Sequence, residues 1–150
     1  MVRESFHNRT PALSPDGRWI AYVSDASGRE EIYVRPFPGD GAPVAISNGG
    51  GTEPVWSRNG ERLYYRTGEG TGRSLVAATV SRTARTFAVR SAVALFNDDL
   101  FLGQPQRNYD VMPGMDRFVM VGDTAARKVP DQIVVLNWFT ELRARLRAVR

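Results

Sequence analysis

The chain has 150 residues, of which 42% are hydrophobic and 24% charged, a balance typical of a folded globular protein and not of a disordered one. It has no cysteine, which excludes disulfide bonds, thiolate metal sites and cysteine nucleophiles. No segment approaches the roughly 20 apolar residues of a membrane span, and the net charge of +4 favours a moderately basic solvated surface over binding to nucleic acid or anionic lipid. Residues 1–17 lack the apolar core of a secretory signal, so export would need a signal upstream of Met1.

A turn stands directly before a short apolar run in the segment "LSPDGRWIAYVS", residues 13–24. Pro15 presets φ for the second position of a turn, and Asp16 tolerates the region that follows. Gly17 accepts a positive φ without steric cost. The segment therefore predicts a hairpin turn that leads into a strand.

The same turn recurs along the chain. Asn59-Gly60 follows Asp16-Gly17 after 43 residues, and Gly114-Met115 lies 55 residues further on. In the third copy Met115 stands where glycine is expected, so that turn is either wider or locally strained. A spacing of roughly 40 to 45 residues, with four short strands in each unit, is typical of propeller blades.

Short runs of β-branched and aromatic residues, separated by Gly, Asn, Asp and Pro, predict an all-β meander. The expected strands are residues 19–24, 31–36, 43–47, 62–67, 74–81, 86–96, 117–122 and 132–138. We expect the strand after each turn to be buried on both faces. Because an isolated four-stranded unit exposes both faces, neighbouring units must stack. Four strand tyrosines are interpreted as packing between units: Tyr22, Tyr33, Tyr64 and Tyr65.

The end of the chain follows a helical pattern instead. In "NWFTELRARLRAVR" the apolar residues fall on one side at helical spacing, with arginines around the rest. Asn137 is a suitable N-cap, and the final arginines suit the negative end of the helix dipole. We expect a short helix at about 138–149 that packs on the last unit; the alternative is a helix that docks on a partner or an anionic membrane surface.

The first two units, "SPDGRWIAYVSDASGREEIYVRPFPG" and "GGGTEPVWSRNGERLYYR", resemble the TolB-like (WD40-like) β-propeller repeat. They look most like the version that follows bacterial serine/threonine kinase domains as an extracytoplasmic tail. The ending "YDVMPGMDRFVMV…QIVVLNWFTELR" is similar to the last blades of those tails, so the resemblance spans about residues 10–146. It implies a periplasmic or extracytoplasmic location. It implies no single function, because the repeat also occurs in TolB and in peptidases of the prolyl oligopeptidase type.

The activities of those relatives are not expected here. The sequence contains no glycine-rich nucleotide loop, no catalytic-loop His-Arg-Asp, no Asp-Phe-Gly and no Gly-x-Ser-x-Gly elbow. His7 is the only histidine and lacks the partners of a metal site or a nucleophile–base pair. We therefore predict no enzyme activity, and no catalytic, cofactor-binding or metal-binding residues.

Other residues that suggest chemistry have simpler interpretations. Asp98-Asp99 is interpreted as a solvated acid pair in a loop, because adjacent side chains usually point apart. Asp16 and Asp25 are expected to bind backbone N–H groups in turns. "GEGTGR", residues 68–73, is similar to a phosphate-binding loop but lacks the lysine-threonine ending and a strand-to-helix context, so a hairpin loop is favoured.

The sequence thus predicts one domain, residues 1–150, with an all-β fold. It is a partial β-propeller of about three four-stranded blades, roughly 7–48, 49–96 and 104–138, with a short C-terminal helix. Propellers have roughly 4 to 8 blades, so three leave a blade face and strand edges open. We expect a C-terminal fragment of a longer protein, with residues 1–10 as the end of a preceding blade. The alternative is a homo-oligomer that completes the propeller, in which two copies supply six blades.

The expected function is that of a non-enzymatic binding or sensing module. Its loops and central opening would present rigid surfaces to a protein, a peptide or a small molecule. The alternative is an accessory propeller domain of a serine/threonine kinase or a prolyl-oligopeptidase-type peptidase, with the catalytic domain outside this chain.

Overall fold

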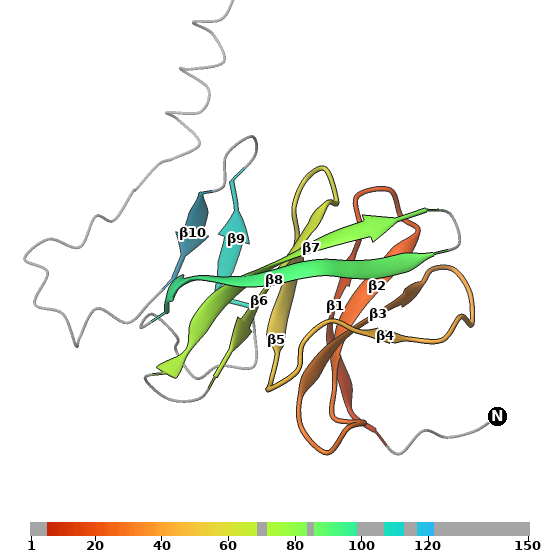
Figure 1. The fold of residues 1–150 in the computed structure, drawn as a ribbon, viewed down its shortest axis with the longest axis horizontal. Coiled ribbons are helices and arrows are strands. Elements are labelled where there is room, and N and C mark those ends of the chain that lie inside the picture. Colours follow the sequence, from red (N-terminus) through yellow and green to blue (C-terminus); the bar gives the residue numbers. More distant parts are fainter. Residues whose placement is uncertain (1–5, 69–71, 84–85, 99–106, 113–116, 122–150) are drawn as a thin grey trace, which may run out of the picture.

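The computed structural model describes residues 6–68, 72–83, 86–98, 107–112 and 117–121, which form three antiparallel sheets (Figure 1). The first sheet holds β1 (Asn8–Leu13), β2 (Trp19–Ser24), β3 (Glu31–Pro36) and β4 (Val44–Ala45). The second sheet holds β5 (Thr52–Trp56), β6 (Arg62–Thr67), β7 (Ser74–Arg82) and β8 (Phe87–Asn97). The third sheet holds β9 (Tyr109–Val111) and β10 (Phe118–Met120). The described residues include no helix, so the prediction of an all-β fold is confirmed for them.

Most predicted strands are present. Those at 19–24, 31–36 and 62–67 begin and end where the sequence predicts. β7 ends one residue later than predicted, and β8 begins and ends one residue later. The strand predicted at 43–47 is shorter, because the Ser47 hydroxyl replaces a backbone partner and accepts the Ile32 N–H at 2.8 Å.

Three other predictions fall differently. The strand at 117–122 shortens to β10. Residues 8–10 do not end a preceding unit; they begin β1, which pairs with β2. The strand at 132–138 and the helix at 138–149 lie outside the described residues.

The two predicted turns are built in the same way. Gly17 and Gly60 have φ values of +70° and +69°, and their N–H groups donate to the carbonyls of Ser14 and Ser57 at 2.8 and 2.9 Å. Each serine hydroxyl donates to the acid or amide side chain two residues later. It also accepts a backbone N–H five residues later, at 3.0 Å in the first turn and 2.9 Å in the second. The serine therefore fixes both arms of each hairpin.

The repeat extends to the third sheet. Equivalent backbone N–H groups bridge to the start of the next strand at 2.8, 2.9 and 2.8 Å: Ser14 to Trp19, Ser57 to Arg62 and Met112 to Arg117. The steps between them are 43 and 55 residues, as in the sequence repeat. Thr10 and Glu53, also 43 residues apart, both take a left-handed backbone conformation at the bulges of β1 and β5, with φ of 48° and 55°. The sequence repeat is therefore a structural repeat.

The sheets stack face to face in chain order, with the second sheet between the other two (Figure 1). The first core is formed by Trp19, Ala21, Val23, Ile32, Val34 and Ile46 from the first sheet and its edge, and by Trp56, Leu63, Tyr65, Val76, Ala78 and Val80 from the second. The second core is formed by Val55, Tyr64, Leu75, Ala77 and Tyr109, with Val111, Phe118 and Met120 against them. Since a fully buried large apolar side chain contributes about 1.5–3 kcal/mol, these contacts hold each sheet to the next.

The expectation that the strand after each turn is buried on both faces holds only for β6, which has a sheet on either side. It is wrong for β2, where Ile20 and Tyr22 are half-buried. It is also wrong for β10, where Val119 is 55% exposed. Both strands belong to end sheets of the described stack, so each has a neighbour on one face.

Candidate docking face on the first sheet

Alternating side chains divide each sheet into two faces. We call front the face that carries Ile20 and Tyr22 in the first sheet, and back the opposite face, which carries Ala21 and Val23. The offsets of 43 and 55 residues place the equivalent front residues in the other sheets: Leu63 and Tyr65 in the second, Phe118 and Met120 in the third.

The sheets contact each other back to front. The first core joins the back of the first sheet to the front of the second, and the second core joins the back of the second to the front of the third. In the described part of the chain, no sheet lies against the front of the first sheet or the back of the third. These two surfaces are the open ends of the stack.

Equivalent front positions differ sharply in burial. Leu13 is 51% exposed on the first sheet, whereas Trp56, its equivalent on the second, is 8% exposed. Tyr22 is half-buried, whereas its equivalent Tyr65 is 4% exposed. The front of the second sheet is covered by the first sheet, so the front of the first sheet is the same kind of surface without its cover.

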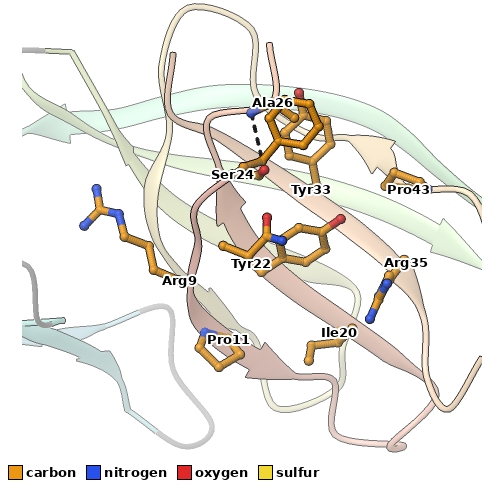
Figure 2. A pocket seen from close by; sticks show the side chains of 11 residues that line it. Arg9, Pro11, Ile20, Tyr22, Ser24, Ala26, Tyr33, Arg35 and Pro43 are labelled. Carbon is orange, nitrogen blue, oxygen red and sulfur yellow. Dashed lines mark hydrogen bonds between the residues drawn. The ribbon is translucent and has the colours of Figure 1, made fainter. Parts of the chain in front are cut away.

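A hollow of about 360 Å³ lies on this open face. Tyr22 stands at its centre, between Ile20 and Pro11 on one side and Tyr33 on the other (Figure 2). The rings of Tyr22 and Tyr33 stack with centroids 6.1 Å apart and planes 28° apart. Pro43, ahead of the short β4, also lines the hollow. The floor is therefore apolar and aromatic.

Two arginines lie at the rim, and one of them is paired with a carboxylate. The Arg35 guanidinium lies 6.0 Å from the centroid of the Tyr22 ring, a cation–π distance. Arg9 pairs with Glu30 beside the hollow. The described residues that line the hollow include no carboxylate and no histidine. This surface can bury apolar groups and donate hydrogen bonds to acceptors.

The four strand tyrosines divide into two pairs. Tyr64 and Tyr65 are buried in the two cores, so their prediction as packing between sheets is confirmed. Burial raises the pKa of Tyr65, with a smaller contribution from Glu31. For Tyr22 and Tyr33 the prediction is wrong, because they stack on each other on the open front of the first sheet.

Asp16 binds a backbone N–H group within its turn, as predicted, whereas Asp25 binds the N–H of a residue 18 positions earlier. Asp16 accepts the backbone N–H of Arg18 at 3.3 Å, and the hydrogen bond from Ser14 lowers its pKa. Asp25 accepts the backbone N–H of His7 at 2.8 Å, which is the main cause of its lowered pKa. The His7 ring lies on the surface with Nδ1 3.1 Å from an Asp25 oxygen. The described residues contain no cluster of three or more potential metal-ligating side chains.

The interpretation of Asp98 as a solvated loop acid is wrong. It is 3% exposed and pairs with Arg66, whose side chain is fully buried. Arg66 also donates to Glu53 at 2.9 Å, and its guanidinium lies 5.0 Å from the ring centroid of Tyr109. Burial raises the pKa of Tyr109 well above its ordinary value, and its hydroxyl donates to the Glu53 carbonyl at 2.6 Å. Asp99 lies outside the described residues.

A second buried carboxylate, Glu31, is held by backbone groups. The N–H groups of Gly49 and Gly50 each donate to it at 2.9 Å, and Ser47 and Arg29 donate as well. The carboxylate thus fills the cradle formed by the two glycines. Residues 68–73 are predicted as a hairpin loop. Residues 69–71 of this segment lie outside the described residues, and the strands on either side, β6 and β7, pair antiparallel.

The sequence pattern assigned Tyr22 and Tyr33 to packing between units and did not identify the open face. A signal was present: Ile20 and Tyr22 occupy the positions of Leu63 and Tyr65, 43 residues earlier. The described residues contain no helix long and apolar enough to cross a membrane. No known family model matches the chain, and no curated protein matches it either.

Proposed function

We propose that the chain is a non-enzymatic protein-interaction module whose three sheets are blades of a partial TolB-like β-propeller. The observation that carries the proposal is the back-to-front stacking of successive repeat units at offsets of 43 and 55 residues. Repeat units of this kind bury their faces against neighbours, so an open face at the end of a stack is a natural place for a partner.

The proposed mechanism is presentation of a pre-formed surface. The front of the first sheet is backed by the first core, so the Tyr22–Tyr33 stack rests on a fixed support. A partner that covers this face buries aromatic rings and offers acceptors to Arg35. Aromatic residues and arginine carry much of the binding energy at protein interfaces.

The second candidate function is an accessory propeller domain of a kinase or peptidase. The open front favours it to the same extent, because a preceding domain of the same polypeptide would cover that face. The codons before Met1 discriminate the two candidates: an in-frame catalytic domain supports the accessory role, and a stop codon with a ribosome-binding site supports the independent module.

Photo-crosslinking tests the proposed function. A photoreactive phenylalanine analogue at Tyr22 in the native cell should yield one dominant adduct with a protein. The same analogue at Asp40, an exposed loop residue, is the matched control. An adduct pattern that is the same at both positions would contradict a docking role for the open face. Hydrolase or kinase turnover that persists through purification would contradict the non-enzymatic assignment.

A further inference from the structure

We propose that the front of the first sheet binds the back of the third sheet of a second copy of this chain, head to tail. This inference rests on the proposed role of the open face as a protein-binding surface and names its partner. The two surfaces lie on different units of the same repeat. Each is equivalent to a face of the second sheet that is buried inside the chain.

The back of the third sheet, like the front of the first, is exposed at positions whose equivalents in the second sheet are buried. Val119 and Val121 are 55% and 62% exposed. Their equivalents in the second sheet, 55 residues earlier, are Tyr64 and Arg66, which are 1% and 0% exposed against the third sheet. If the front of the first sheet of one copy docked on the back of the third sheet of another, the contact would repeat the back-to-front packing that joins the three sheets within one copy.

Charge favours this pairing over the symmetric ones. Arg35 is exposed on the front of the first sheet. Asp110, placed on the back of the third sheet by its pairing with Val119, has a side chain that is 66% exposed and lies 3.5 Å from the Arg107 guanidinium. A front-to-front contact would bring Arg35 toward Arg35, and a back-to-back contact would bring Asp110 toward Asp110. Of the three pairings, front-to-back is the one that brings Arg35 toward Asp110 and not toward a second copy of itself.

Because front and back are different surfaces, the contact is heterologous, and association continues until a ring closes. The wild-type protein should therefore increase in mass with concentration in light scattering. Tyr22→Glu places an acid in the centre of the front, opposite a surface that already holds Asp110. Val119→Arg places a cation on the back, opposite Arg35. Each change should weaken self-association at least about 30-fold, the effect of losing one central interface residue.

Mixing the two variants is the decisive experiment. The Tyr22→Glu copy keeps its back and the Val119→Arg copy keeps its front, so each should be monomeric alone and the mixture should form a 1:1 dimer. Leu95→Glu on the edge strand β8, at a residue that is 43% exposed, is the matched control and should associate like the wild type. Near-UV circular dichroism of each variant tests that the sheets remain stacked.

Several outcomes would overturn the inference. A Val119→Arg variant that still forms dimers would indicate a front-to-front contact. A wild-type protein that stays monomeric at millimolar concentration, with native near-UV dichroism, would exclude self-docking. If Tyr22 at the same time crosslinks to a different protein, the self-docking fails while the proposed function stands.

Discussion

The buried arginine between the second and third sheets provides the sharpest test of what holds the stack together. Arg66 is fully buried, with Glu53 and Asp98 as its anionic partners, and both carboxylates are buried as well. Arg66→Met keeps much of the side-chain volume and removes the charge. It leaves two carboxylates in the interior without their cation.

The expected cost follows from that geometry. Removing one partner of a buried ion pair destabilises a protein by about 3–5 kcal/mol. Because a domain of this size has a free energy of unfolding of about 5–15 kcal/mol, Arg66→Met should remove a large fraction of it. Asp98→Asn leaves the Glu53 carboxylate beside the cation and keeps a hydrogen-bonding group, so its expected cost is about 1–3 kcal/mol.

Urea unfolding monitored by the fluorescence of the buried Trp19 and Trp56 measures these differences. The double variant Arg66→Met/Asp98→Asn should cost less than the sum of the two single changes, by about 0.5–3 kcal/mol, because the cation and one anion are removed together. Arg9→Met is the matched control. It breaks a pair with Glu30 whose side chains are 34% and 47% exposed, so it should cost at most about 1 kcal/mol.

The reasoning would be refuted if Arg66→Met and Arg9→Met lowered the free energy of unfolding by the same amount. It would also be refuted if the costs of Arg66→Met and Asp98→Asn simply added. Either result would mean that the buried ions do not act as one unit between the sheets.

Two further predictions concern the glycine turns and the loss of stability at low pH. Gly17→Ala should cost about 1–2 kcal/mol, because its φ is +70° and an added Cβ meets no atom within 4 Å. Gly60→Ala should cost more, because at nearly the same φ the added Cβ displaces the Arg82 guanidinium, which donates to the Gly60 and Asn59 carbonyls at 2.8 and 2.9 Å; parallel urea titrations measure the difference, and equal losses would contradict it. Burial raises the pKa of Glu31, but the hydrogen bonds led by Ser47 outweigh burial and lower it overall. The stability from this group is therefore present above its ordinary pKa of 4.5 and is lost as pH falls through the lowered value. Glu31→Gln should destabilise the protein at pH 7 and much less at acid pH, and a cost that does not change with pH would contradict this.

The strands and turns could be predicted from the sequence because their signals are local. The aromatic run of residues 62–67 directly follows the Asn59-Gly60 turn, and the serine before each turn supplies hydrogen bonds within five residues. The bulges at Thr10 and Glu53 were not predicted, because neither residue type signals a left-handed backbone.

Long-range contacts were the part that the sequence did not reveal. Asp98 was interpreted as a loop acid because its partner Arg66 lies 32 residues away in another strand. Tyr22 and Tyr65 occupy the same place in the repeat, so pattern alone gives them the same burial. The difference between them arises from the neighbouring sheet, which Tyr65 has and Tyr22 lacks in the described part of the chain.

The residues of the open face differ from those of an ordinary solvent-exposed surface. At its centre Ile20 and Tyr22 stand where the buried second sheet has Leu63 and Tyr65, so apolar character is kept at positions that water reaches. Arg35, by contrast, stands where the second sheet has the fully buried Ala78. An apolar centre with a charged margin is a composition common in protein interfaces, and it is consistent with the proposed docking role of this face. The same reasoning predicts that Arg35→Ala weakens association while leaving the free energy of unfolding nearly unchanged, because Arg35 is exposed and its cation–π contact is with Tyr22, a half-buried ring on the open face.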